Sequence, residues 1–463
     1  MKKILLLALL VAMGKANAQD TRAQKIDSLF TSLAAKGQFN GNVLIAEKGN
    51  VLYKKSFGLR DEAAKLPLND TSIFELASVS KQFTAMGIVL LEQKGKLKYD
   101  DPIVKYIPEL GFYKGVTIRQ LLNHTGGLPD YMQLIGTKGD TTKINTNKDI
   151  ITLFAKEKPE ADFTPGSKFE YSNTGYALLA SIIEKASGKT YAMFLADNIF
   201  KPLKMENTFV YNRRLAPKKV ENYAYGYVYD ANGKKLLPDN DPDRSYVICL
   251  DGIVGDGTVN STTVDLLKWD RALYTDKLAS KKSLELVFTP PVLPNDEKTK
   301  YAFGWIIDAS AEYGKVTAHS GGWPGYVNYI ERHIDNDKTI IVLQNNENGM
   351  SFLKNVRRLL YGKAPEVVKD TQTEITLTEA QLTPFVGEYE LEPGFNMEMT
   401  LDNGQLYTQI PGQEKFPVFA ESENTFFLKV VKAQLVFEKD STGTVINAIL
   451  KQNGNEFVVK KVK

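Results

Sequence analysis

Cysteine and histidine are almost absent from this chain of 463 residues. Their scarcity argues against several classes of enzyme that depend on these residues. Cys249 is the only cysteine, so no intrachain disulfide can form and no C-x-x-C motif exists. The three histidines form no H-E-x-x-H motif, and no serine stands within G-x-S-x-G. Zinc hydrolases and α/β-hydrolases are therefore not indicated, and we expect neither a metal nor a cofactor.

A strong excess of charge of either sign is also missing. The chain carries 58 basic and 55 acidic residues, for a net charge of +3. No basic patch or arm stands out, so we expect no nucleic-acid partner. Hydrophobic residues at 43% and charged residues at 24% are close to the usage of soluble globular proteins, and the length suggests two or three domains.

The apolar run at the N-terminus is too short to span a bilayer, which takes about 20 residues. It covers Ile4–Met13, follows Lys2 and Lys3, and precedes the small-residue pattern Ala16-Asn17-Ala18. This order predicts a signal peptide over residues 1–18, with an N-terminal membrane anchor as the alternative. We therefore expect an exported protein, periplasmic or secreted, without a membrane span once the signal is removed.

Residues 19–362 alternate between helical and strand patterns in an order that indicates an α+β fold. Strand patterns occur near both ends of this region, and its long middle is helical and loop-rich. Such an order predicts an antiparallel β-sheet, built from both ends of the domain and flanked by helices. The expected strands cover 40–47, 51–57, 302–308, 316–319, 326–332 and 339–344, and the expected helices include 20–36, 78–94 and 351–361.

A break in the pattern separates a second region. Residues 363–378 are polar, contain Pro365 and show no apolar period, which is typical of a linker. Residues 379–463 hold short alternating strands separated by turn residues. They predict a small all-β domain, a barrel or a sandwich by its spacing.

The strongest chemical signal is Ser78-Val79-Ser80-Lys81, an S-x-x-K motif at the start of a buried apolar helix. Three residues are just under one helical turn, so Ser78 and Lys81 should share a face. A helix N-terminus favours negative charge on a serine oxygen, and a lysine at this spacing can exchange a proton with the hydroxyl. We expect Ser78 to be the nucleophile. Ser80 is the alternative by residue type, but it does not stand three residues before the lysine.

Tyr171-Ser172-Asn173 supplies a second set of polar groups. Pro165-Gly166 turns the chain before it and a helix follows, so the motif is expected at a tip that faces a cleft. A tyrosine beside a lysine can act as base and then as acid, and Asn173 can donate to a substrate carbonyl. The alternative is structural: Asn173 caps the helix and Tyr171 packs as an ordinary aromatic residue.

His319-Ser320-Gly321 ends a strand pattern and supplies a third set. A strand that ends in glycines lets a substrate backbone lie alongside it. The amide of Gly322 can then join the amide of Ser78 as an oxyanion hole. We expect His319, Ser320 and Gly321 to bind substrate, with a plain polar strand end as the alternative.

Two further residues are expected to be structural. His124 stands in LLNHTGGLP, and bonding to turn backbone is favoured over a role as a second base. Cys249 stands in the apolar stretch YVICL, which favours a small buried hydrophobic residue over a nucleophile.

In this order and at these separations, the three motifs resemble those of the serine β-lactamase and penicillin-binding protein superfamily, whose elements are S-x-x-K, S-D-N and K-T-G. The resemblance covers about residues 39–361 and includes the stretches 117–129 and 255–262. Tyr-Ser-Asn in the second motif is similar to class C β-lactamases and related D-alanyl-D-alanine carboxypeptidases, D-aminopeptidases and family VIII esterases. Histidine in the third motif is closer to the peptidase and esterase members. The C-terminal region resembles the small β domains that often follow this catalytic domain.

The resemblance implies a β-lactamase/transpeptidase-like fold and acyl transfer through Ser78, with Lys81 and Tyr171 handling protons. The expected substrate is a D-amino-acid peptide or amide or a small ester, with peptidoglycan fragments among the candidates. The alternatives are a β-lactamase and a penicillin-binding sensor that acylates without turnover. A lysine in the third motif would be a permanent charge for a substrate carboxylate, whereas histidine is mostly neutral above its pKa of about 6.5. Weak turnover of cephalosporins is therefore expected. The sequence does not identify a protein partner.

Overall fold

The chain divides into two compact units, Met1–Met350 and Ser351–Lys463. The computed structural model describes residues 20–230, 233–366, 374–392, 395–410, 415–429, 433–452 and 455–462. The expected signal peptide lies outside the described residues, as does the middle of the expected linker, and the domain boundaries drawn from the sequence stay predictions. Within these ranges, no helix has both the length and the apolar character needed to cross a membrane.

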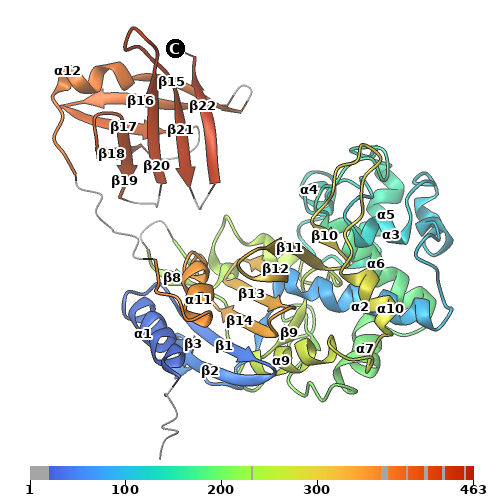
Figure 1. The fold of residues 1–463 in the computed structure, drawn as a ribbon. Coiled ribbons are helices and arrows are strands. Elements are labelled where there is room, and N and C mark those ends of the chain that lie inside the picture. Colours follow the sequence, from blue (N-terminus) through green and yellow to red (C-terminus); the bar gives the residue numbers. More distant parts are fainter. Residues whose placement is uncertain are drawn as a thin grey trace, which may run out of the picture. The chain divides into compact units, whose positions relative to one another are not determined.

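An antiparallel sheet of seven strands forms the centre of the first unit (Figure 1). Strand β1 lies beside β14, with Gly41 opposite Gln344, so strands from both ends of the unit meet as predicted. Strand β11 pairs with β12 only from Gly314 to Ala318, and the rest of β12 reaches toward the site. In sheet order the strands are β10 Tyr301–Ala302, β11 Trp305–Ser310, β12 Gly314–Trp323, β13 Tyr326–His333, β14 Lys338–Gln344, β1 Gly41–Glu47 and β2 Asn50–Phe57.

The strand predicted over 302–308 is two strands, because a turn at Phe303 and Gly304 interrupts it. Both residues have positive φ, at 39° and 85°. A side chain at Gly304 would lie 2.8 Å from the backbone of Gln82, so the turn packs directly on the helix that carries Lys81. Close backbone contact therefore explains both the glycine and the break, and neither produces a signal in the apolar pattern.

Helices flank this sheet. Helix α9 packs against β14 and β1, α1 packs against β2, and α2 packs against α6 and α7. Almost every residue of α2 is buried, which makes it the central helix of the first unit. The helices are α1 Thr21–Ala35, α2 Lys81–Gln93, α3 Ile118–Leu122, α4 Tyr131–Lys138, α5 Asn147–Glu157, α6 Asn173–Ser187, α7 Tyr191–Leu195, α8 Tyr246–Cys249, α9 Thr263–Ala272 and α10 Lys281–Val287.

Short elements complete the first unit. Three of them, β5, β9 and β6, form a small sheet from which the chain enters the turn that carries Ser78. The short strands are β3 Leu59–Asp61, β4 Leu66–Pro67, β5 Phe74–Glu75, β6 Phe209–Val210, β7 Val228–Tyr229, β8 Lys235–Leu236 and β9 Val259–Ser261. The short helical turns are η1 Ala77–Ser80, η2 Ile103–Lys105, η3 Pro108–Leu110, η4 Ala196–Phe200 and η5 Pro238–Asn240.

The second unit contains a closed antiparallel barrel, so of the two predicted forms it is the barrel that occurs. Phe385, Phe426 and Phe437 meet in its core, with ring centroids 4.8 to 5.6 Å apart. The sequence patterns predicted strands at 387–391, 397–401, 405–410, 426–431 and 434–438, and missed β18, β21 and β22. The elements are α11 Leu353–Leu360, α12 Glu379–Leu382, η6 Thr383–Phe385, β15 Gly387–Glu392, β16 Phe395–Asp402, β17 Gln405–Gln409, β18 Phe416–Ala420, β19 Thr425–Leu428, β20 Ala433–Lys439, β21 Val445–Gln452 and β22 Asn455–Lys461.

Candidate active site

Ser78 lies in the short turn η1, one turn before helix α2. The helix predicted to start at Ser78 begins with the 3₁₀ turn η1 and becomes α-helical at Lys81. Ala77, the first residue of η1, has a left-handed backbone with φ of 49°. A left-handed residue other than glycine or asparagine is uncommon, and such strain concentrates at functional sites. The kink at Ala77 turns the chain from β5 into η1 and places Ser78 on the wall of a cleft.

Strand β12 approaches this turn more closely than a side chain would permit. A Cβ atom at Gly321 would lie 2.2 Å from the carbonyl oxygen of Leu76 and 3.2 Å from the amide nitrogen of Ser78. Gly321 is buried, and glycine is therefore required for β12 and η1 to meet. At Gly322 a Cβ atom would meet nothing within 4 Å, and this residue lines the same cleft as Ser78. The two amides expected to form an oxyanion hole thus border one cavity.

Lys81 is fully buried and makes three polar contacts. Its Nζ lies 3.0 Å from Ser78 Oγ, 2.9 Å from Asn173 Oδ1 and 2.9 Å from the carbonyl oxygen of Asp256. The last two atoms can only accept hydrogen bonds, so they take two of the ammonium protons. The third position on Nζ faces the serine hydroxyl. This position holds a proton in the ammonium form of the lysine and a lone pair in its neutral form.

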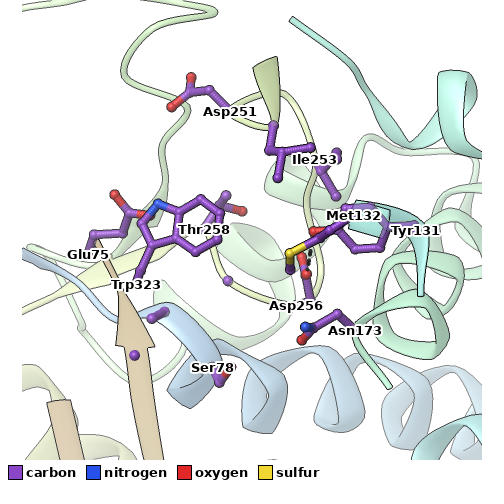
Figure 2. A pocket seen from close by; sticks show the side chains of 14 residues that line it. Glu75, Ser78, Tyr131, Met132, Asn173, Asp251, Ile253, Asp256, Thr258 and Trp323 are labelled. Atoms are coloured by element: carbon purple, nitrogen blue, oxygen red, sulfur yellow. Dashed lines mark hydrogen bonds between the residues drawn. The ribbon is translucent and has the colours of Figure 1, made fainter. Parts of the chain in front are cut away.

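Asn173 is the first residue of helix α6 and faces the cleft from the side opposite Trp323 in Figure 2. The helix cap is Ser172, whose Oγ accepts the amide of Gly175 at 3.1 Å, so the alternative of Asn173 as the cap is wrong. Because Oδ1 of Asn173 points to Lys81, the Nδ2 donor remains available to a substrate in the cleft.

Tyr171 lies beside Lys81, but it is the face of its ring and not its hydroxyl that contacts the lysine. The lysine Nζ is 4.9 Å from the ring centroid, and the tyrosine side chain is 42% exposed. The tyrosine ring also lies 4.3 Å from the ring of His124. Tyr171 borders a second, smaller hollow of about 310 Å³ together with Asp162 and Glu170. The described residues include no hydrogen bond from the phenol to Ser78 or Lys81, so its proton-handling role stays a proposal.

His319 is buried, and both of its ring nitrogens are engaged. Nδ1 lies 2.5 Å from the carbonyl oxygen of Ser320, and Nε2 lies 2.9 Å from the hydroxyl of Tyr301. Since a carbonyl only accepts, Nδ1 carries the proton and Nε2 accepts from the tyrosine. Burial, with the nearby charge of Lys81, lowers the pKa of His319 to about 3. His319 is therefore neutral at neutral pH, as expected, and its role in substrate binding stays a proposal. Ser320 is exposed, as a substrate-binding residue would be.

Sequence reasoning missed the acidic wall of the cleft. The buried carboxylate of Asp256 accepts a hydrogen bond from Tyr131 at 2.8 Å, while its carbonyl holds Lys81. Burial raises the pKa of Asp256, with Lys81 opposing, and burial raises the pKa of Glu75 to about 7. The loop Gly-Asp-Gly-Thr at 255–258 was the available signal, because loops positioned by a rigid scaffold often carry binding and catalytic residues.

The predictions for His124, Ser80 and Cys249 can be compared with this arrangement. The Nδ1 atom of His124 accepts the amide of Ser172 at 3.0 Å, so the histidine bonds backbone as expected, but within the second motif and not in its own turn. Ser80 is fully buried, and its hydroxyl accepts the amide of Val259 at 3.0 Å, which removes it from contact with a substrate. Cys249 is buried, as its apolar neighbours predicted.

Comparison with known proteins identifies the family to which this chain belongs. The family model described as "Beta-lactamase" matches residues 26–362, and a model described as "Domain of unknown function (DUF3471)" matches residues 371–461. The chain belongs to the Beta-lactamase family. This is the serine hydrolase superfamily with the β-lactamase fold, which the three sequence motifs predicted.

Relatives extend over both regions. "Penicillin-binding protein 4*" of Bacillus subtilis is 45% identical over 428 residues, which cover 90% of this chain and 94% of that protein. Among solved structures, the octameric penicillin-binding protein homologue from Pyrococcus abyssi has a TM-score of 0.66 and 26% identity, covering 94% of this chain and 99% of its own. The D-amino acid amidase from Ochrobactrum anthropi SV3, complexed with L-phenylalanine amide, has a TM-score of 0.58 and 25% identity, covering 73% and 96% of the two chains.

Proposed function

We propose that this protein is an exported serine hydrolase that forms an acyl-enzyme on Ser78. The observation that carries the proposal is the position of Lys81, whose Nζ is 3.0 Å from the serine oxygen while its other two contacts are obligate acceptors. A buried amine fixed in this way can receive the serine proton without first reorganising. Export rests on the sequence pattern of residues 1–18 and is tested by the N-terminal residue of protein recovered outside the cytoplasm.

Acylation begins when Ser78 Oγ attacks the substrate carbonyl carbon. The hydroxyl proton passes to Lys81 and, through Tyr171, to the leaving group as its bond to the carbonyl breaks. The amides of Ser78 and Gly322 donate to the oxygen that gains negative charge. Asn173 donates from Nδ2 to the bound substrate, and Ser320 and Gly321 border the strand edge beside which it lies. The product of this half-reaction is an ester on Ser78.

Deacylation requires a water molecule in place of the leaving group. Tyr171 takes a proton from that water as the water oxygen attacks the ester, and the proton returns to Ser78 through Lys81. The exposure of Tyr171, at 42%, supports this role because water reaches the phenol from the neighbouring hollow. No metal or cofactor enters either half-reaction.

The substrate we propose is a D-amino-acid amide or peptide, or a small ester. His319 supports this class, because a buried neutral imidazole with a pKa of about 3 supplies no fixed charge for a substrate carboxylate. The likeness to a D-amino acid amidase points the same way, and peptides derived from peptidoglycan are the natural extension of that chemistry.

Penicillin acylation with slow release is the second candidate. It is favoured by the 45% identity, over nine-tenths of the chain, to a protein named as penicillin-binding. The two candidates share the acylation half-reaction and differ in the rate at which the ester on Ser78 is cleaved. Their products, free acid or stable adduct, separate them.

The test follows a labelled penicillin, nitrophenyl acetate and D-phenylalanine amide over time with the full-length protein. Catalytic release of nitrophenol and D-phenylalanine supports the hydrolase. A stoichiometric burst with a lasting penicillin label, and no turnover of either neutral substrate, supports the second candidate. Lys81→Ala should abolish both behaviours, and activity that survives it would contradict the role of Lys81.

A further inference from the structure

His124 holds the backbone on both sides of Tyr171. Its carbonyl oxygen accepts the amide of Glu170 at 2.9 Å, and its Nδ1 accepts the amide of Ser172 at 3.0 Å. These two amides flank Tyr171 in the sequence, so one residue fixes the chain before and after the proposed acid–base group. Because the backbone sets where a side chain starts and which way it leaves, the two bonds orient the phenol.

The imidazole of His124 also packs against the side chain of Tyr171. The two ring centroids are 4.3 Å apart, with planes at 38°. His124 is 1% exposed, whereas Tyr171 is 42% exposed. A half-exposed side chain has few neighbours to restrict it, so the buried imidazole is a main surface against which the ring of Tyr171 is placed.

The backbone of His124 is left-handed, with φ of 57°. Such a backbone is uncommon outside glycine and asparagine, and it concentrates at functional sites. The next residues continue the contact with the segment before Tyr171, since the carbonyls of Thr125 and Gly127 accept the amides of Gly166 and Asp162. The left-handed residue therefore stands where the chain leaves helix α3 and joins the segment that leads to the second motif.

One nitrogen of His124 has a hydrogen-bond partner among the described residues, and the other has none. Since Nδ1 accepts an amide, the proton of the neutral ring is on Nε2, which is buried and unpartnered. Burial, with the nearby charge of Lys81, lowers the pKa of His124 well below its usual value, so Nδ1 remains an acceptor at neutral pH. The histidine thus acts through Nδ1 and through its ring faces.

The same imidazole connects the second motif to the third. Tyr301, whose ring centroid is 4.3 Å from that of His124, donates its hydroxyl to Nε2 of His319. The rings of Tyr171 and Tyr301 are 6.0 Å apart. Tyr171 and His319 are therefore placed against one group of rings, and His124 is the member of that group that bonds to the backbone of the second motif.

We propose that His124 is a positioning residue for Tyr171, which places the phenol relative to Ser78 and Lys81 and does not itself exchange a proton with the substrate. The proposal rests on the proposed acyl transfer at Ser78, in which Tyr171 moves protons in both half-reactions. Loss of His124 should therefore lower kcat far more than it raises KM.

Three substitutions in the full-length protein separate the two contacts. His124→Asn keeps a short acceptor and a residue type that tolerates positive φ, but it removes the ring. His124→Phe keeps a ring and removes the acceptor, and His124→Ala removes both. We expect kcat for nitrophenyl acetate to fall by about 30- to 100-fold in His124→Ala and by about tenfold in each of the others, with KM changed by less than about threefold, because a displaced catalytic group lowers the rate more than the affinity.

A double-mutant cycle with Tyr171→Phe separates positioning from a general loss of structure. Where His124 acts through Tyr171, His124→Ala should change kcat by less than about twofold once Tyr171 is already Phe, since coupled residues are not additive. Losses that multiply in the double variant overturn the proposal, as does a Tyr171→Phe protein with wild-type kcat. His124→Asn takes the place of His124→Ala in the cycle if the alanine variant does not fold.

His333→Asn is the matched control. His333 is also fully buried and bonded, to Glu331, but it lies at the end of β13 away from Trp323. It should lower the melting temperature while kcat, measured below that temperature, stays within about twofold of the wild-type value. Equal losses of kcat in His124→Ala and His333→Asn overturn the positioning role.

The outcome for the wild-type protein keeps this proposal distinct from the acyl-transfer function. Wild-type hydrolysis that survives His124→Ala unchanged overturns the positioning role alone. A wild-type protein that neither hydrolyses the ester nor takes a covalent label at Ser78 overturns the acyl-transfer function itself, and the positioning role with it.

Discussion

The hydroxyl of Tyr301 donates to Nε2 of His319 across 2.9 Å, and this bond decides what the histidine can do. The tyrosine is itself buried, and burial raises its pKa well above the usual value, so it stays a donor. Because the protonated Nδ1 donates a hydrogen bond to the carbonyl of Ser320, the imidazole is held in one neutral tautomer. His319 is therefore suited to position the end of β12 and not to carry charge to a substrate.

The first prediction concerns the pH dependence of substrate choice. Since the pKa of His319 is about 3, this residue stays neutral between pH 6 and pH 8. The ratio of kcat/KM for an anionic cephalosporin to that for a neutral nitrophenyl ester should then change less than about twofold over this range. A ratio that rises tenfold toward pH 6 would show that His319 titrates in the site.

The second prediction concerns stability in acid. The unfolded chain binds a proton at His319 below pH 6.5, whereas the folded protein does so only near pH 3. Stability from this residue is thus constant above pH 6.5 and is lost as the pH falls from 6.5 toward 3. His124, whose pKa is also lowered by burial, acts in the same direction.

Urea unfolding at pH 7.5 and pH 4.5 measures this loss. His319→Gln should show a smaller decrease in the midpoint between the two pH values than the wild-type protein, because one of the two histidines whose pKa is lowered by burial is removed. An equal or larger decrease in the variant would contradict the assignment.

The third prediction separates the two serines of the S-x-x-K motif. Ser78→Ala should lower ester hydrolysis by about 10⁴-fold or more and abolish covalent labelling, since loss of a nucleophile that acts within a unit has effects of this size. Ser80→Ala removes a buried hydrogen bond to Val259 and should cost about 1–2 kcal/mol of stability while labelling continues. Labelling that survives at Ser78→Ala and disappears at Ser80→Ala would reverse the assignment.

The fourth prediction uses two adjacent glycines as a matched pair. Gly321→Ala places a methyl group 2.2 Å from the carbonyl of Leu76 and must push β12 away from Ser78. We expect a loss of about 1–3 kcal/mol in stability and a large loss of activity, as in other overpacked sites. Gly322→Ala meets open space and should keep the wild-type melting temperature. Equal behaviour of the two variants would show that β12 does not contact the nucleophile turn as described.

The fifth prediction concerns the C-terminal barrel. All residues that line the proposed site lie between Glu75 and Trp323, and the barrel has a hydrophobic core of its own. A chain that ends at Lys363 should therefore fold and hydrolyse a small ester with kcat/KM within about threefold of the full-length value. Insoluble or inactive protein, beside an active full-length control, would assign the barrel a part in the core or the site.

The sequence predicted what depends on local pattern. Apolar periodicity located the strands from both ends of the sheet, and the spacing of Ser78 and Lys81 anticipated their contact, because three residues is a distance that a helical turn itself sets.

What failed depends on contacts between distant segments. The left-handed turn at Ala77 and the break at Gly304 arise from close packing on other segments, which leaves no apolar period. His319 was expected at a strand end beside a substrate, and the pattern gave no sign of the hydrogen bond from Tyr301 that it accepts in the folded chain. Asp256 belongs to the site because its backbone carbonyl accepts a hydrogen bond from Lys81, which lies 175 positions earlier in the sequence.

The pairing of β1 with β14 also sets the order in which activity can arise. Gly41 pairs with Gln344, and the turn that carries Ser78 packs against Gly321. The sheet and the proposed site therefore cannot form before these segments, which are late in the sequence, have been synthesised. Pairings of such long range are slow to form and cannot be replaced by local ones. A growing chain therefore cannot assemble the proposed site until nearly the whole first unit has been synthesised.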